Sequence, residues 1–170
     1  MPRTSLESFN CSLARTVDII GDQWTLLILR DAFYGISSFS DFSKRLGLAR
    51  TVLTDRLNRL VEHEILRKEQ TKPGVDRYRY KLTTKGKDLF PVIVSLVNWG
   101  DRWIFGADNE PIRIFDKRTQ SPVQNVKVQA RDGHVLEPHE VTFGPGPGAS
   151  SETLLAFKKA NERLNVIKPD

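Results

Sequence analysis

The chain has 170 residues, of which 39% are hydrophobic and 28% charged, and its formal net charge is +5. These values are typical of one globular domain, or of one domain with an appendage, and no apolar run reaches the length of a membrane-spanning helix. The single cysteine, Cys11, excludes an internal disulfide framework and a multi-cysteine zinc site. Because the first ten residues lack the apolar core of a signal peptide, we expect a cytoplasmic protein.

The positive charge is concentrated in one part of the chain. Residues 44–87 contain 13 Lys and Arg against 5 Asp and Glu, whereas residues 106–170 contain 9 of each kind. Such a concentration is typical of a surface that faces phosphate groups. A solvated basic surface without a partner would give the same count, so charge alone does not separate the two interpretations.

Residues 12–20 and 24–33 predict the first two helices. The first has apolar side chains on one face only, and Gly21 ends it. The second is apolar on nearly all sides up to Gly35, which indicates that it lies at the centre of the domain. Burial is therefore the simplest role for Trp24.

A helix-turn-helix is predicted next. Residues 41–46 form a short helix that Ser40 caps and Gly47 ends, and the turn GLA leads into another helix. In this fourth helix, polar and apolar side chains separate at helical spacing. The apolar face contains Leu53, Leu57, Leu60 and Val61, and the polar face contains Arg50, Thr51, Thr54, Asp55 and Asn58.

After that helix the hydrophobic period changes to that of strands. The segments ILRKEQT and RYRYKLT predict two short strands, joined by KPGV, in which Pro73 and Gly74 suit a tight turn. A helix followed by a basic hairpin is the pattern of a winged helix. The helix fits the major groove of DNA, and the hairpin can reach phosphates or the neighbouring minor groove.

Residues 83–103 predict a long helix, in which Pro91 should cause a bend or offset. Its apolar side chains exceed what one short helix needs to cover a small domain, so we expect a homodimer interface here, with packing inside one chain as the alternative. The expected interface residues are Leu89, Ile93, Leu96, Val97, Trp99 and Trp103.

Beyond residue 105 the pattern indicates a C-terminal extension. Residues 112–115 and 123–130 alternate as strands do, RDGH suits a hairpin turn, GPGPGAS is a linker, and residues 151–164 predict a terminal helix. The predicted fold is α+β but mainly α. A winged helix-turn-helix domain occupies residues 1–105, and an extension with a β-hairpin appendage and a terminal helix occupies residues 106–170.

Three segments, in this order, give the chain a specific family resemblance. They lie within roughly residues 11–104, and they are CSLARTVDIIGDQWTLLILRDAFYG, FSDFSKRLGLARTVLTDRLNRLVEHEILRK and YRYKLTTKGKDLFPVIVSLVNWGDRW. The chain resembles the HxlR family of bacterial winged helix-turn-helix transcription regulators, which are related to the MarR group. The resemblance implies a dimer that binds a near-palindromic operator in double-stranded DNA and represses or activates neighbouring genes.

The same resemblance implies which residues contact DNA. They are Lys44, Arg50, Thr51, Thr54, Arg56, Lys72, Arg77 and Arg79. Arg50 is the expected base reader, because an outward Arg near the start of a recognition helix can donate two hydrogen bonds to guanine. Lys72, Arg77 and Arg79 are expected on phosphates. Arg56 has an alternative role, in which it lies along the core and pairs with a carboxylate.

The chain also departs from the family pattern. Relatives often have Ser or Thr at the position of Ala49 and Gly at that of Glu64, so the recognition helix should lack a side-chain cap and end in a strained turn. In the extension, Gln129 and Asp132 stand where a subset of relatives has zinc-binding cysteines. We therefore predict a hairpin without metal or other cofactor.

Regulation has two candidate routes. Cys11 precedes the first helix, as a redox-sensing cysteine does in some relatives, and a packed thiol is the alternative. Trp24, Trp99 and Trp103 could form the walls of a small-molecule effector cavity, or belong to the core or the dimer interface. Enzyme motifs are missing from the sequence, so we expect no catalysis. The alternative function is that of a winged-helix protein interaction module.

Overall fold

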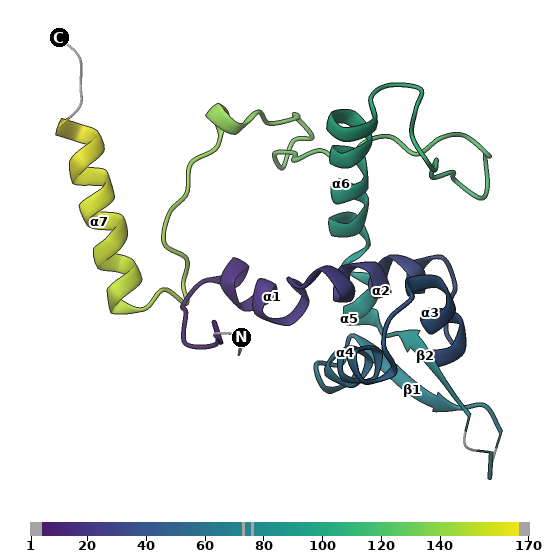
Figure 1. Ribbon diagram of the computed structural model, residues 1–170. Helices are drawn as coiled ribbons and strands as arrows, with labels where there is room; N and C mark the ends of the chain where they lie inside the picture. Colours follow the sequence, from purple (N-terminus) through teal and green to yellow (C-terminus); the bar gives the residue numbers. More distant parts are fainter. Residues whose placement is uncertain (1–4, 73, 76, 167–170) are drawn as a thin grey trace. The chain divides into compact units, whose positions relative to one another are not determined.

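The computed structural model describes residues 5–72, 74–75 and 77–166, with side chains up to residue 162 (Figure 1). Pro73, which the sequence places in a tight turn, lies outside the described residues. The chain forms two compact units, one of Ile19–Val126 and one that joins Met1–Asp18 to Lys127–Asp170. These limits differ from the boundary at residues 105 and 106 that the sequence suggests for the domains.

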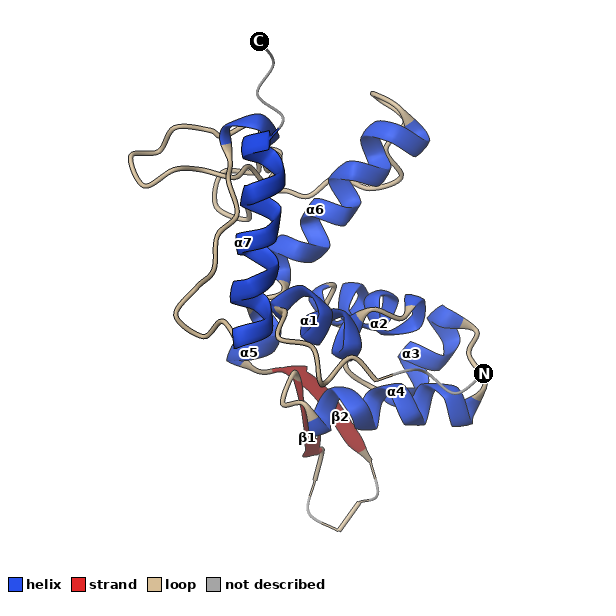
Figure 2. Cartoon of the chain, turned by 90° about the vertical axis from the view of Figure 1, so that its left-hand side faces the viewer, coloured by secondary structure: helices blue, strands red, loops and turns tan. Residues whose placement is uncertain are grey.

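The first unit has the element order of a winged helix-turn-helix, and it is mainly helical, as predicted. A two-stranded antiparallel sheet forms the wing (Figure 2). Helix α1 (Ser12–Ile20) spans the sequence boundary between the two units. The elements that follow, up to the wing, are α2 (Gln23–Phe33), α3 (Phe39–Leu46), α4 (Arg50–Glu62), β1 (Leu66–Gln70) and β2 (Tyr78–Leu82). After the wing come α5 (Thr84–Lys87), α6 (Phe90–Gly100) and the π-helix η1 (Asp101–Phe105).

The hydrophobic core of this unit is centred on α2, as its nearly continuous apolar character predicts. Ile28 and Leu29 have no exposed surface, and α4 supplies an apolar face that packs on them. The other buried members of the cluster are Ile20, Phe42, Leu53, Leu57, Leu60, Ile65, Leu66, Tyr80 and Ile93. Burial of this set fixes α3, α4 and the hairpin around one helix.

The prediction that Ser40 caps the third helix is wrong. Ser38 is the N-cap of α3: its backbone is extended, and its hydroxyl accepts a 3.1 Å hydrogen bond from the Asp41 N–H. The helix therefore begins two residues earlier, and Ser40 lies in its first turn. Gly47 ends α3 with a φ of 64°, the left-handed conformation that glycine adopts without strain.

The predicted long helix after the wing is interrupted at Asp88 and Leu89. Pro91 lies in the first turn of α6 and not inside a continuous helix, and at that position its missing N–H has no intrahelical partner to lose. The preceding turn, α5, is fixed by Thr83, whose hydroxyl accepts from the Gly86 N–H at 3.0 Å and donates to the Glu64 carbonyl at 2.6 Å.

The extension forms turns where the sequence predicts strands. Residues 112–115 and 123–130 contribute only isolated bridges, Phe115 with Pro122 and Gln129 with Val135, so the β-hairpin appendage is not formed as a sheet. The RDGH turn is present, because the Ala130 N–H donates to the His134 carbonyl at 2.8 Å. The terminal helix is also present, as α7 (Ser151–Val166), after the short 3-10 helix η2 (Pro138–Glu140).

Candidate nucleic-acid interface

Helix α4 separates its side chains into a buried and an exposed face, as predicted. Leu53, Leu57 and Leu60 expose at most 1% of their surface to solvent. Arg50 and Thr54 project from the other side, and Figure 2 shows α4 running beside the hairpin. The exposed residues of the helix include four that can donate hydrogen bonds from their side chains: Arg50, Thr51, Thr54 and Asn58.

Arg50 is held near the turn between the two helices of the motif. Its guanidinium carbon lies 5.3 Å from the centre of the Phe39 ring, which belongs to the first turn of α3. A cation over an aromatic face is attracted by the ring, so Phe39 restricts the positions that this exposed side chain can take. The ring leaves the N–H groups of the guanidinium available to a partner.

Arg56 pairs with two carboxylates, which is the alternative to its expected DNA contact. Its Nε donates to Oδ1 of Asp22 at 3.1 Å, and its Nη1 lies 2.6 Å from Oδ2 of Asp55. Asp22 is also the N-cap of α2 and accepts from the N–H groups of Trp24 and Thr25, both at 3.1 Å. One carboxylate thus caps the central helix and holds the recognition helix.

The pKa of Asp22 reflects both its burial and its partners. Burial raises this pKa, but the hydrogen bonds from the hydroxyl and N–H of Thr25 and the charge of Arg56 outweigh that effect and leave it lowered. The carboxylate therefore remains ionised at neutral pH, the form in which it accepts all of these hydrogen bonds.

A second carboxylate fixes α3 against α2. Asp31 is completely buried, and its oxygens accept from Nε of Arg30 at 3.0 Å and from Nε of Arg45 at 3.1 Å. Both arginines also lie about 6 Å from the ring of Tyr34. Because Arg45 belongs to α3, this contact sets the first helix of the motif relative to the core.

The wing is a regular hairpin with exposed basic residues. β1 and β2 pair from Leu66 with Leu82 to Gln70 with Tyr78, and Gly74 in the connecting loop has a φ of 76°. Hydrogen bonds from Lys81 and Arg67 lower the pKa of Glu69, which keeps a negative charge between them. The predicted phosphate contacts Lys72, Arg77 and Arg79 are exposed, as is Lys44 on α3.

Both departures at the ends of α4 have the expected local geometry. Ala49 is the N-cap residue and makes no side-chain capping hydrogen bond, whereas Asp22, Ser38 and Thr83 all cap their helices. Glu64, two residues after α4, has a φ of 58°. That conformation is strained in a residue with a Cβ atom.

The six residues expected at the dimer interface lie on different faces of α6 and its neighbours. Ile93 is buried in the core, and Leu89 packs against it, so these two already have partners within the chain. Leu96, Trp99 and Trp103 are between 51% and 64% exposed. Val97 lines a cavity beside the helix. Leu89 and Ile93 therefore pack within the chain, and the interface at the exposed residues stays a prediction.

Cys11 belongs to the other unit, where the N-terminal arm contacts the start of α7. Cys11 is exposed, and the neighbouring Asn10 accepts hydrogen bonds from the Ser150 N–H and the Thr153 hydroxyl, both at 2.9 Å. Arg15, one turn into α1, lies 4.0 Å from Glu7. Within the described residues, no group of three or more His, Cys, Asp and Glu side chains is placed to hold a metal ion.

Sequence reasoning missed the residues that position the helices. Asp22 stands out in GDQW as an N-cap, but its link to Arg56 joins residues 34 positions apart and has no local signal. Asp31 and Arg45 look like ordinary charged residues of two helices. Two adjacent charged residues, Arg30 and Asp31, within a largely apolar helix are the available indication of a buried ion pair.

The fold, with an exposed donor-rich helix beside a basic wing, defines the class of winged helix-turn-helix DNA-binding proteins. A family model for the HxlR-like helix-turn-helix matches residues 19–108. The chain belongs to this family. Its relatives are transcriptional regulators, so the protein is a DNA-binding transcriptional regulator and not an enzyme.

Individual relatives extend the similarity beyond the family region. The uncharacterized HTH-type transcriptional regulator Rv3095 of Mycobacterium tuberculosis is 34% identical over 137 residues, which are 81% of this chain and 87% of the relative. The crystal structure of PA1607, a candidate transcription factor, is similar with a TM-score of 0.78 and 37% identity, and covers 84% of this chain and 100% of that one. For PA1374 of Pseudomonas aeruginosa the TM-score is 0.60 and the identity 32%, over 86% and 99% of the two chains.

The regions covered by these two structures reach past the family match into the C-terminal part of the chain. Among residues 5–166, leaving aside 73 and 76, no helix is long and apolar enough to cross a bilayer.

Proposed function

We propose that this protein is a cytoplasmic homodimeric repressor that binds a near-palindromic operator. Helix α4 enters the major groove, and the wing contacts the backbone or the adjacent minor groove. The observation that carries the proposal is the exposed polar face of α4, on which Arg50, Thr51 and Thr54 lie opposite three fully buried leucines. A helix held rigidly by its apolar face can present the other face to base edges in a fixed register.

Arg50 is the proposed base reader, with Phe39 restricting its position. Lys44, Lys72, Arg77 and Arg79 are proposed to neutralise phosphates, which gives affinity for any sequence. Arg56 acts through Asp22 and Asp55 to hold α4, and we assign it a positioning role. Thr51 and Thr54 are proposed to complete the contact along the helix.

The dimer is proposed to form through the exposed apolar stripe of α6 and η1. Val92, Leu96, Trp99 and Trp103 recur at intervals of three or four residues, and all are at least 43% exposed. Contiguous exposed apolar side chains of this kind are typical of protein contact surfaces. Two copies joined through it would present two α4 helices to half-sites about 34 Å apart, the distance of one DNA turn.

Gel-shift titration tests the base reader. The DNA is the segment upstream of the protein's own gene, with an unrelated fragment as competitor. Arg50→Ala should weaken specific binding by about 5- to 150-fold, the worth of one bidentate contact to a base, while Arg77→Ala should weaken both fragments alike. Arg118→Ala is the matched control, because Arg118 is an exposed arginine outside the motif.

Failure to bind any DNA at low salt would reject the proposal and favour the protein interaction module. Sedimentation velocity tests the dimer: Leu96→Asp should yield monomers, whereas Val128→Asp, at an exposed valine of the extension, should not. Equal sedimentation of both variants would reject the α6 interface. Oxidation at Cys11 is proposed as one route of regulation, to be tested by peroxide treatment of the wild type and Cys11→Ser in the same gel shift.

A further inference from the structure

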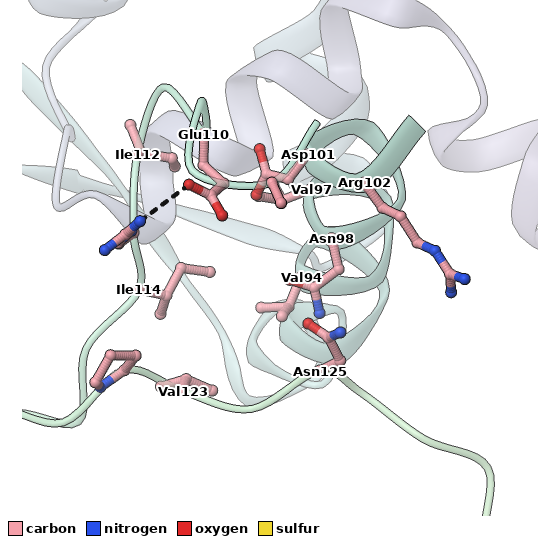
Figure 3. A pocket seen from close by; sticks show the side chains of 13 residues that line it. Val94, Val97, Asn98, Asp101, Arg102, Glu110, Ile112, Ile114, Val123 and Asn125 are labelled. Atoms are coloured by element: carbon pink, nitrogen blue, oxygen red, sulfur yellow. Dashed lines mark hydrogen bonds and ion pairs between the residues drawn. The ribbon is translucent and has the colours of Figure 1, made fainter. Parts of the chain in front are cut away.

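A cavity of about 580 Å³ lies beside α6, within the same compact unit as the helix-turn-helix. One wall is α6, with Val94 and Val97, and the opposite wall is the segment after η1, with Ile112 and Ile114 (Figure 3). The volume is within the range of sites that bind small organic molecules. The three tryptophans that the sequence suggests as cavity walls do not line it.

One polar group in the cavity wall lacks a partner. Nδ2 of Asn98 is buried and has no hydrogen-bond partner in the described part of the chain. A buried donor left unpaired costs about 1–3 kcal/mol, so such groups in folded proteins call for an explanation. Asn98 lines this cavity, and Asn125 lies nearby on the facing segment (Figure 3). A ligand with an acceptor oxygen would satisfy the donor.

The charges at the far end of the cavity restrict the ligand. Asp101 and Glu110 lie there, and hydrogen bonds from its own N–H and from Arg113 lower the pKa of Glu110, so it carries a negative charge. Arg113 is engaged with both Glu110 at 3.2 Å and Asp108 at 3.3 Å, and Arg102 is directed away from the cavity (Figure 3). An anionic ligand would therefore be repelled by these carboxylates. Among the described lining residues, it would find no arginine that is both unpaired and directed into the cavity.

We infer that this cavity binds an uncharged, largely apolar small molecule that carries a carbonyl or ether oxygen, which accepts a hydrogen bond from Asn98. The proposed ligand binding depends only on the cavity and its lining residues. Its regulatory role rests on the proposed repressor function: because Val94 and Val97 lie on the helix that bears the dimer stripe, a bound molecule changes the packing of α6 and thereby the spacing of the two recognition helices.

Three matched probes test the binding by NMR on the full chain: acetophenone, α-methylstyrene, in which a CH₂ group replaces the ketone oxygen, and benzoate. Acetophenone should shift the side-chain amide signals of Asn98 and the backbone signals of residues 94–98 and 112–114. The other two should bind more weakly. Asn98→Leu should reduce acetophenone affinity about fivefold, the worth of one hydrogen bond, and remove the preference over α-methylstyrene.

Two variants of similar size separate the cavity from the surface. Val123→Trp should fill the cavity and abolish all probe shifts, whereas Val128→Trp, outside the lining, should leave them unchanged. Three results would overturn the inference: no shifts, tighter binding of benzoate, or shifts of the signals of residues 112–114 with protein concentration alone, which would mean that a second copy covers the cavity wall opposite α6.

DNA binding is measured separately, so that failure of the ligand site and failure of the repressor are distinguishable. Saturating acetophenone should change operator affinity at least threefold for the wild type and not for Val123→Trp. An unchanged affinity despite NMR binding would overturn the regulatory part. If the protein binds no DNA but its Asn98 signals respond as expected, the repressor function is wrong and the ligand site stands.

Discussion

The helix-turn-helix region and the extension beyond residue 106 differ in how well their hydrophobic patterns predict the observed secondary structure. In residues 19–82 every predicted helix and both strands of the wing are present, whereas the alternating segments of the extension form only isolated bridges. The difference lies in burial. Leu53 and Leu57 are fully buried, but Val128 is 65% exposed and Phe143 is 83% exposed.

Alternation of apolar and polar residues thus predicts a strand only where another element covers the apolar face. A two-stranded hairpin without such cover is marginal in water. β1 and β2 have that cover, because Leu66 and Tyr80 pack into the core. The turn residues of the extension act locally and form their turns regardless, as Gly133 does with a φ of 90°. Variants can test this contrast in pairs, one in each region.

The largest effect is expected at Gly86, in the tight contact between α5 and Ile65, the residue before β1. A Cβ atom there would overlap the Ile65 carbonyl oxygen, so Gly86→Ala must displace backbone and should lower the free energy of unfolding by about 3 kcal/mol. Gly146→Ala in the extension has no atom within 4 Å of the new Cβ and should change stability by less than about 0.5 kcal/mol. Urea denaturation measures both, and equal effects would contradict the contrast.

The next effect is expected at Asp31. Asp31→Asn removes the charge that Arg30 and Arg45 share, and should cost about 2–4 kcal/mol, since one partner of a buried ion pair is lost. The two arginines are partly exposed and regain some hydration, which places the value toward the lower end. Asp116→Asn, at a partly exposed carboxylate of the extension that accepts from the Arg118 N–H at 2.8 Å, is the control and should change thermal unfolding far less.

The sequence predicts interactions that are local and misses those that are not. The sequence predicts α1 at its observed bounds, and Ala49 and Glu64 have the expected geometry, because caps and turns depend on neighbouring residues. The sequence predicts the cap of α3 two residues late, since both Ser38 and Ser40 fit the pattern and only the bridge from Ser38 to Arg79 of the wing distinguishes them.

Long-range features had no such signal. The interruption between α5 and α6 follows from the packing of Thr83 and Gly86 on residues 64 and 65, which a helical pattern does not reveal. The cavity beside α6 lies between segments that sequence reasoning assigned to different domains. Its position depends on how the chain after η1 folds back. Neither the composition nor the hydrophobic period of the sequence predicts that path.

A smaller, pH-dependent effect is expected at Asp22. Asp22→Asn weakens the cap of α2 and the contact with Arg56, and should cost about 1–2 kcal/mol at pH 7. Because the folded pKa lies below the ordinary value of 3.8, this stability is fully present above the unfolded pKa and is lost as pH falls through the folded one. The gap between wild type and variant should be constant from pH 7 to about pH 5 and shrink below about pH 4.

The smallest effect is expected at Glu64, and it has the opposite sign. Glu64→Gly removes the strain of a φ of 58° but adds the flexibility of glycine to the unfolded chain, so the net gain in stability should be about 0.5 kcal/mol. Glu64→Ala is the matched control, because it removes the same charge and keeps the Cβ atom, and it should give no gain. A gain in both variants would show that charge and not backbone strain is responsible. Since this turn joins α4 to β1, stabilisation confined to Glu64→Gly would mean that the wing is held beside the recognition helix at some cost in backbone energy.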